Sequence, residues 1–154
     1  MLHAMRVVIQ RVDGADVTVD GRVTGRIDLG IVALVGIAAG DDAATARELA
    51  TKTCDLRIFA EGDKPFHRSL RDVGGGLLVV SQFTLAGDTR RGRRPSWAAA
   101  ARPEDAEPLV AEYARAAQDL GVTVAHGVFG AHMRVALTND GPVTLVLDAS
   151  PATA

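Results

Sequence analysis

The stretch Ser-Gln-Phe-Thr at 81–84 brings two hydroxyl groups and an amide to the end of an apolar run, residues 77–80. A hydroxyl group attacks an ester only when a base takes its proton and a further group orients that base. None of the four histidines, at positions 3, 67, 126 and 132, has a spacing that marks it as this base, and no G-x-S-x-G turn is present. The residues alone leave three interpretations open: a nucleophilic Ser81 or Thr84, the wall of a hydrogen-bonding pocket, or a plain strand end.

A second group of chemically capable residues lies a few positions further along the chain. Arginine forms paired hydrogen bonds with phosphate groups, and an aromatic ring can stack on a nucleic-acid base. The net charge is −2, so four arginines within five positions depart sharply from the charge of the whole chain. The pattern indicates contact with RNA or phosphate, with a solvated loop as the alternative. The residues are Arg90, Arg91, Arg93, Arg94 and Trp97.

Metal and thiol chemistry find little support. His126 and His132 lie six positions apart with no H-x-x-x-H pattern or carboxylate cluster, so we expect neither a metal ion nor another cofactor. The single cysteine, Cys54, falls on the apolar stripe of a predicted helix and is expected in the core. One cysteine, no apolar run of about 18 residues and no signal-like N-terminus together indicate a cytoplasmic protein without a membrane span.

The elements that must position these residues alternate between strands and helices. Residues 5–38 are predicted to form strands, with a hairpin turn at Asp20-Gly21 and an apolar run at 30–38 that suits a strand buried on both faces. A helix is predicted to begin after an N-cap at Asp41 or Asp42 and to reach Cys54. A second helix is expected to start near 107, because Pro108 would break a helix that began earlier.

The remaining strands are predicted at 56–60, 77–83, 122–126, 131–138 and 143–148, with long loops at 61–76 and 86–102. On a strand at 77–83, residues 81 and 83 would face one side and residue 82 the other. The sequence NDGP at 139–142 is typical of a turn between the last two strands, and composition alone favours a trans X-Pro bond. The fold class is therefore one α/β domain over residues 1–154, with a mixed, partly barrel-like sheet, two helices and the order β3-α-β2-α-β3.

Seven segments in order along the chain resemble the D-aminoacyl-tRNA deacylase family. Together they extend over residues 5–148, which leaves 1–4 and 149–154 as expected flexible ends. Residues 64–70, KPFHRSL, and Gly87 depart from the family pattern. The matching segments are IQRV at 9–12, VTVDGRVTG at 17–25, RIF at 57–59, VVSQFTLAGDT at 79–89, GRRPSW at 92–97, GVFGAHM at 127–133 and NDGPVT at 139–144.

The resemblance implies a homodimer that hydrolyses the ester between a D-amino acid and the 3′ end of tRNA. It implies that Gly141-Pro142 is cis and enters the partner's pocket, where its carbonyl groups exclude L-amino acids. The facing wall would be residues 81–84, with catalytic positions Ser81, Gln82, Phe83 and Thr84. The substrate-binding positions would be Ala101, Phe129, Gly130, Met133, Gly141 and Pro142. The arginine cluster and Trp97 would contact the tRNA.

Two mechanisms and two function classes follow from these residues. Main-chain atoms near Phe83, Thr84 and Ala101 could orient water and stabilise the oxyanion, with help from the terminal 2′-OH of the tRNA; alternatively, Thr84 is the nucleophile. A backbone filter cannot reject glycine, so hydrolysis of glycyl-tRNA, including glycine mischarged on tRNA(Ala), is expected. The second class is a non-catalytic nucleic-acid-binding module that uses residues 90–97.

Overall fold

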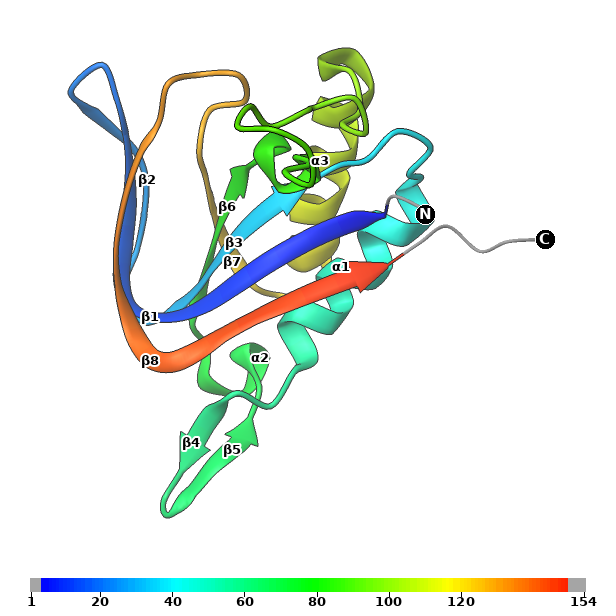
Figure 1. Ribbon diagram of the computed structural model, residues 1–154. Coiled ribbons are helices and arrows are strands. Elements are labelled where there is room, and N and C mark those ends of the chain that lie inside the picture. The colour runs from blue at the N-terminus through cyan, green and yellow to red at the C-terminus, as the bar shows by residue number, and fades with distance from the viewer. Residues whose placement is uncertain (1–3, 150–154) are drawn as a thin grey trace.

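The computed structural model describes residues 4–149, which form one mixed sheet with helices on one face (Figure 1). The sheet order is β2-β1-β3-β6-β7, with β8 paired to β1, and β4 and β5 form a separate hairpin. The elements are β1 Met5–Val19, β2 Arg22–Ile27, β3 Gly30–Gly36, α1 Ala43–Asp55, β4 Phe59–Glu61, β5 Lys64–Arg68, α2 Leu70–Val73, β6 Gly76–Ser81, the 3-10 helix η1 Phe83–Ala86, α3 Pro103–Asp119, β7 Thr123–His126 and β8 Arg134–Ala149.

The long bent strand β1 gives the sheet its partly closed shape. Its first half pairs with β3, its second half pairs with β2, and β8 runs antiparallel along its other edge through both halves. The strands β3, β6 and β7 are mutually parallel. Two apolar cores result: a larger one between the sheet and helices α1 and α3, and a smaller one inside the curve of β1, β2 and β8. The predicted α/β class with a partly barrel-like mixed sheet is confirmed.

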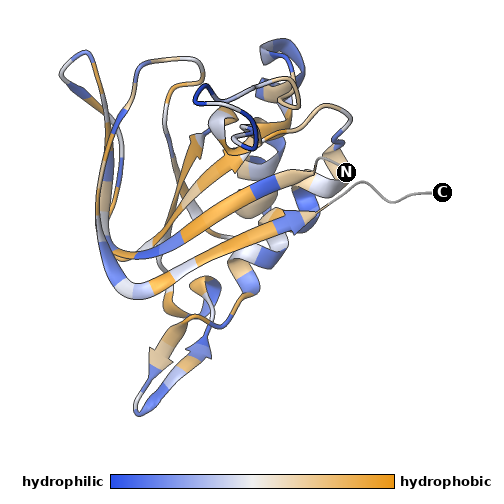
Figure 2. Cartoon of the chain, in the orientation of Figure 1, coloured by the Kyte–Doolittle hydropathy of each residue, from blue (hydrophilic) through white to orange (hydrophobic). Residues whose placement is uncertain are grey.

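Apolar residues fill both faces of the central strands, as the sequence predicted. Four of the seven residues in β3, Ile31, Val32, Ala33 and Val35, are buried hydrophobic side chains, and Leu34 is partly buried against the smaller core. The middle four residues of β6 are buried, and Figure 2 shows both strands as largely hydrophobic. A strand between two cores needs apolar side chains in both directions, which explains why neither sequence alternates. These two strands therefore form a rigid base for whatever follows their carboxyl ends.

Three local predictions are confirmed by the backbone. Asp20 and Gly21 both have positive φ, +50° and +79°, which is the conformation of a type I′ hairpin turn. Asp42 caps α1 by accepting a hydrogen bond from the Thr45 N–H at 2.8 Å. Cys54 is fully buried in the larger core. No helix within residues 4–149 is long and apolar enough to cross a bilayer.

Three predicted boundaries are wrong. The strand at 77–83 ends at Ser81, because η1 begins at Phe83, so the expected alternation of faces beyond residue 81 does not occur. The predicted turn NDGP lies inside the continuous strand β8, which bends with β1 where the register shifts near Val12. The predicted loop at 61–76 contains most of the β4–β5 hairpin and the short helix α2, so there are three α-helices rather than two.

The start of α3 also differs from the prediction. The helix begins at Pro103 and passes through Pro108, which lies on its exposed side. Asp105 and Ala106 both donate their N–H groups to Arg102 O, so the first turn forms before the second proline. Pro108 leaves only the carbonyl of exposed Glu104 without a helical donor, and water can replace that donor. Of the expected flexible ends, Ala149 instead pairs with Met5, while residues 1–3 and 150–154 lie outside the described residues.

Candidate active site

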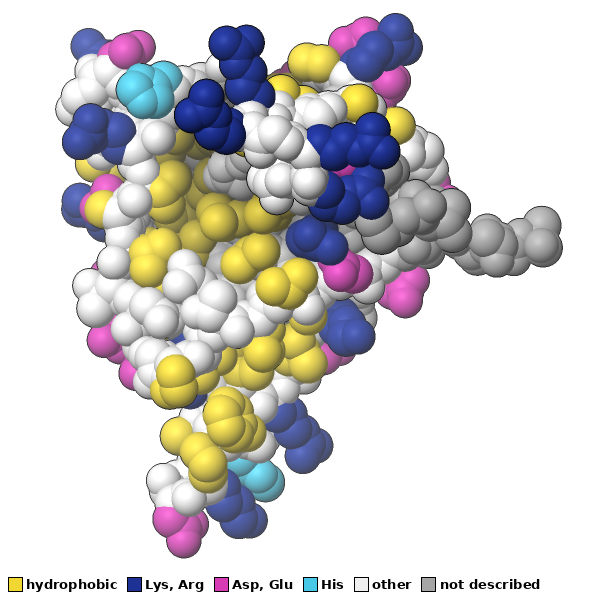
Figure 3. Space-filling view, viewed as in Figure 1, with side chains coloured by type: hydrophobic (Ala, Val, Ile, Leu, Met, Phe, Trp, Pro, Cys, Tyr) yellow, Lys and Arg dark blue, Asp and Glu magenta, His cyan; other side chains and the backbone are white. Residues whose placement is uncertain are grey.

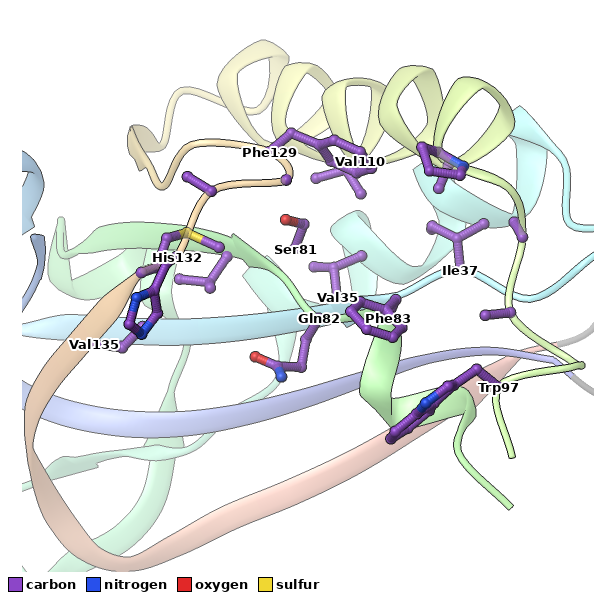
Figure 4. A pocket seen from close by; sticks show the side chains of 18 residues that line it. Val35, Ile37, Ser81, Gln82, Phe83, Trp97, Val110, Phe129, His132 and Val135 are labelled. Atoms are coloured by element: carbon purple, nitrogen blue, oxygen red, sulfur yellow. The ribbon is translucent and has the colours of Figure 1, made fainter. Parts of the chain in front are cut away.

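A cavity of about 630 Å³ opens at the carboxyl ends of the parallel strands β3 and β6. Ligands commonly bind at this edge of a parallel sheet, because the loops that follow the strands meet there. Figure 4 shows Phe129 and Val110 across from Gln82 and Phe83, with His132 and Trp97 at opposite ends. The cavity thus brings together five segments of the chain: residues 35–37, 80–83, 97–101, the first half of α3 and 129–135.

The floor of the cavity is the end of β6 and the turn into η1. Gln82 donates its N–H to Val35 O at 2.8 Å, which keeps the chain against β3 for one residue beyond the end of β6. The next residues tighten into η1, and the Gln82 side-chain amide donates to Thr84 Oγ1. Ser81, Gln82 and Phe83 line the cavity, whereas Thr84 is not among its lining residues.

The loop between β7 and β8 forms a second wall. Gly127 donates its N–H to Val79 O at 2.9 Å, and the Val128 N–H donates to Met133 Sδ at 3.4 Å. The first hydrogen bond holds the loop against β6, the second links two residues within the loop, and Phe129 and Gly130 line the cavity. On the strand predicted at 131–138, the adjacent side chains of His132 and Met133 would face opposite sides. Both residues line the cavity, because β8 begins only at Arg134 and strand alternation does not apply to this loop.

The wall beside α3 consists of small and apolar side chains. Ala101 lines the cavity, and its N–H donates to Ile37 O at 3.0 Å. That N–H is therefore engaged and is not a free donor for a ligand. Ala106 and Val110 of α3 complete this wall, and the sequence interpretation did not include them. The only available signal was the apolar stripe of the helix, which is equally typical of a helix that does nothing but cover a core.

The cavity has little side-chain acid or base chemistry. The 18 described residues that line it include no Asp, Glu, Lys, Arg or Cys, and their polar side chains other than the Trp97 indole are Ser81, Gln82 and His132. Within residues 4–149 no group of three or more His, Cys, Asp or Glu side chains could hold a metal ion. An arrangement of this kind can bind an apolar group and offer hydrogen bonds, but it does not contain a nucleophile–base–acid triad.

The segment with Gly141 and Pro142 lies elsewhere on the same chain. The Gly141-Pro142 peptide bond is cis, both residues are exposed on β8, and neither lines the cavity. Composition alone had favoured the trans form, whereas the family resemblance implied the cis form. The resemblance therefore supplied the correct geometry for this bond.

Side chains from β1 and β8 hold this segment in place. Arg11 Nε lies 2.9 Å from Asp140 Oδ2, an ion pair in which the N–H does not point at the oxygen, and its Nη1 donates to Ile58 O at 2.6 Å. Asn139 Nδ2 donates to both Arg11 O and Val143 O, at 2.9 and 3.1 Å. The backbone on both sides of Gly141 is therefore fixed to β1 within the same chain.

The four arginines predicted to contact nucleic acid lie on an arm, residues 88–96, that leads from η1 back to the cavity. Asp88 and Ser96 form an isolated antiparallel bridge at its base. All four arginines are exposed, and Arg90 also binds Asp88 through two side-chain hydrogen bonds of 2.9 and 2.7 Å. In the space-filling view, Lys and Arg side chains gather along the upper part of the face, with hydrophobic surface below them (Figure 3).

The aromatic pair at the mouth of the cavity connects it to the arm. Phe83 and Trp97 pack edge to face, with ring centroids 5.4 Å apart and an interplanar angle of 72°. Both rings line the cavity and remain substantially exposed, 57% for Phe83 and 41% for Trp97. The structure thus brings eight predicted site residues to one cavity, and it leaves Thr84, Gly141, Pro142 and the four arginines outside it. The eight are Ser81, Gln82, Phe83, Trp97, Ala101, Phe129, Gly130 and Met133.

The fold and the cavity define a class of single-domain α/β proteins with a substrate-sized apolar pocket at the edge of a partly closed sheet. The family model described as D-Tyr-tRNA(Tyr) deacylase matches residues 8–148, so the chain belongs to this family of hydrolases. The predicted family membership is confirmed.

Individual relatives agree with the family assignment. A D-aminoacyl-tRNA deacylase from Nocardia farcinica is 59% identical over 147 residues, covering 94% of this chain and 99% of the relative. The protein of the same name from Roseiflexus castenholzii is 58% identical over 146 residues, covering 95% and 93%. Among solved structures, the c-Myc DNA Unwinding Element Binding Protein is 34% identical, with a TM-score of 0.86 over 96% of this chain and 99% of that chain.

Proposed function

We propose that the chain hydrolyses the ester bond of D-aminoacyl-tRNA and releases the free D-amino acid and tRNA. The observation that carries this proposal is the cavity in which Ser81, Gln82 and Phe83 face Phe129 and Met133, in a chain whose family match extends over residues 8–148. The cavity volume of about 630 Å³ is in the range of small-molecule sites and suits an aminoacyl group with its terminal nucleoside.

The chemistry requires little from side chains, because an aminoacyl ester is already reactive. A water oxygen bonds to the carbonyl carbon, and the carbonyl oxygen becomes an oxyanion. The bond to the ribose oxygen then breaks; one water proton ends on that ribose oxygen, and the new carboxylic acid ionises. The step that most needs the protein is stabilisation of the oxyanion, to which one well-placed donor contributes about 10²–10³ in rate.

The N–H groups of Phe83 and Thr84 are the proposed donors for this oxyanion, and of these two residues Phe83 lines the cavity while Thr84 directly follows it. They are the first two N–H groups of η1, where a helix provides no internal acceptors, and neither donates to another group among residues 4–149. Because the Ala101 N–H is already engaged by Ile37, Ala101 acts as a wall rather than as a donor. The terminal 2′-OH of the tRNA is then free to orient the attacking water.

Chiral selection is proposed to come from a second copy of the chain. The exposed Gly141-Pro142 segment lies outside its own cavity, so it can act as a filter only in the cavity of a partner. Strand β8 pairs only with β1 among the described elements, and its Leu145 and Val146 are exposed by 38% and 57%. An apolar edge strand of this kind favours association with another copy. Carbonyl groups placed where an L side chain must lie exclude L substrates sterically and leave D substrates unaffected.

The arginine arm is proposed to bind the acceptor end of the tRNA. The exposed arginines 91, 93 and 94 can contact phosphates, and Trp97 can stack on a base beside the cavity mouth. A substrate of this kind is found where translation takes place, which supports a cytoplasmic location. The same features would serve a nucleic-acid-binding module without catalysis, and the name of one structural relative refers to DNA binding. The curated relatives favour the enzyme.

One assay separates these possibilities. Purified protein is mixed with D-tyrosyl-tRNA, L-tyrosyl-tRNA and glycyl-tRNA(Ala) in parallel, and ester loss is followed under single-turnover conditions. We expect rapid loss of the D-tyrosyl ester, measurable loss of the glycyl ester and no loss of the L-tyrosyl ester. Binding without D-selective hydrolysis favours the module. If glycyl-tRNA persists at saturating enzyme while D-tyrosyl-tRNA is cleared, steric exclusion is the wrong account of chirality.

A further inference from the structure

The base of the arginine arm contains a close contact between a glycine and the tryptophan. Asp88 and Ser96 exchange backbone hydrogen bonds of 2.8 and 2.9 Å across an antiparallel bridge. In an antiparallel pair the next residues outward also face each other, and here these are Gly87 and Trp97. The indole therefore lies over a position that has no side chain.

The space that the indole occupies is the space a side chain at 87 would need. A Cβ atom placed on Gly87 would lie 2.6 Å from Trp97 Cζ3 and 3.2 Å from Cε3, well inside contact distance. It would also lie 2.9 Å from Thr84 O, which accepts the Gly87 N–H at 3.0 Å and thereby fixes the backbone of this residue to η1. The indole makes the shorter of these contacts and belongs to a side chain, so it is the group that a larger residue at 87 displaces first.

The indole joins the cavity to the arm. On one side it packs edge to face on Phe83 and lines the cavity, and on the other it directly follows Ser96 at the base of the arm. The Arg90–Asp88 pair anchors the Arg90 guanidinium at the base of the arm, and the arginines at 91, 93 and 94 are exposed beyond it.

We propose that Gly87 is a positioning residue that seats Trp97 between Phe83 and the arm, so that the arm presents its exposed arginines to the tRNA in register with the cavity. This inference rests on the proposed function for the identity of the ligand, although the seating of the indole does not. Gly87 touches no reacting atom. Its effect passes through Trp97 to the binding of the acceptor end.

The first test is G87A, read through intrinsic fluorescence. Trp97 is the single tryptophan of the chain, so its emission and its quenching by iodide report the indole without labelling. Displacing the ring into solvent is expected to raise the iodide quenching constant about twofold, because the indole is now 41% exposed. The matched control is G14A in β1, where a Cβ would meet only Ile27 O at an ordinary 3.7 Å. Quenching that is the same in G87A and G14A overturns the proposal.

The second test separates binding from chemistry with D-tyrosyl-tRNA as substrate. G87A is expected to raise KM about tenfold, which corresponds to the loss of one charge-assisted phosphate contact. The same variant is expected to change kcat by less than about twofold. Uncharged tRNA is expected to bind G87A more weakly by the same factor in a filter-binding assay. A fall in kcat at unchanged KM, or unchanged tRNA affinity, contradicts a role that acts through the arm.

The third test is reciprocal rescue. W97F replaces the indole by a smaller ring and leaves a gap over Gly87, so KM is expected to rise about threefold through loss of apolar contact. In G87A/W97F the new methyl group fills that gap, and KM is expected to return to within about twofold of the parent value. If the double variant is as poor as G87A or worse, the proposal fails. W97F alone still tests the seating if G87A does not fold, since an unchanged KM overturns it.

These outcomes remain distinct from those of the proposed function. If the parent chain does not hydrolyse D-tyrosyl-tRNA at all, the proposed function is wrong, and no KM can be measured. The quenching of Trp97 and the affinity for uncharged tRNA still decide whether Gly87 seats the indole and whether the indole positions the arm.

Discussion

Replacing Thr84 by Ala is expected to change the hydrolysis rate only slightly if the Thr84 hydroxyl is structural, and by several orders of magnitude if it is the nucleophile. The Thr84 side chain does not line the cavity, and the partner of its Oγ1 is a donor, the Gln82 amide, rather than a base. The main-chain carbonyl of Thr84, which accepts the Gly87 N–H at 3.0 Å, survives the substitution, so η1 should keep its shape. The change removes one neutral, solvent-accessible hydrogen bond. Such a bond contributes about 0.5–1.5 kcal/mol, so the rate should fall by no more than about tenfold.

A nucleophile would give a different result. Removing the attacking group of a covalent mechanism costs about 10⁴-fold or more. The assay is single-turnover hydrolysis of D-tyrosyl-tRNA at saturating enzyme, which is insensitive to product release. T84V, which keeps the shape without the hydroxyl, and T84S, which keeps the hydroxyl, are the matched controls. If T84A and T84V lose more than about 10³ in rate while T84S stays active and all remain folded, the main-chain mechanism is refuted.

Three further predictions concern the stability and reactivity of the scaffold. Burial raises the pKa of Cys54 to about 11, so its thiol should react with Ellman's reagent at pH 8 only as fast as the protein unfolds. D42A should lower the melting temperature by about 2–4 °C through loss of the N-cap bond to Thr45. That bond lowers the pKa of Asp42, so the difference between D42A and the parent should be full above about pH 4 and vanish as pH falls below it. Y113F removes the buried hydroxyl pair with Thr53, 2.7 Å apart, and should cost about 1 kcal/mol in urea unfolding.

The parts of the fold that followed from sequence are those in which one local rule dominates. Asp20-Gly21 adopts positive φ at both positions, and few other dipeptides do so readily. Asp42 caps α1 because a short acceptor precedes an apolar helical stripe. The continuous apolar run of β3 could be buried on both faces only inside a layered α/β fold. In each case the local preference and the tertiary structure agree.

The errors arise where tertiary contacts override a local rule. NDGP has the composition of a turn, but pairing with β1 on both sides of the bend keeps it within β8. Pro108 has the chemistry of a helix breaker, but its position on the exposed side of α3 leaves an unpaired carbonyl that water can reach. The end of β6 at Ser81 is set by the contact of η1 with β3, which no local pattern around residue 82 could reveal.

The site was only partly predictable because its chemistry belongs largely to the backbone. Ser81 and Thr84 carry hydroxyl groups that could act as nucleophiles. The cavity contains no carboxylate, Lys, Arg or Cys that could act with either of them. The N–H donors that could stabilise an oxyanion come from the turn at Phe83 and Thr84, and every residue except proline carries such a donor. Residue identity therefore could not mark them. These N–H donors are recognised instead by the backbone geometry, which tightens from β6 into a 3-10 helix at the mouth of the cavity. A substitution that alters η1 should therefore impair hydrolysis more than the deletion of any single hydroxyl group.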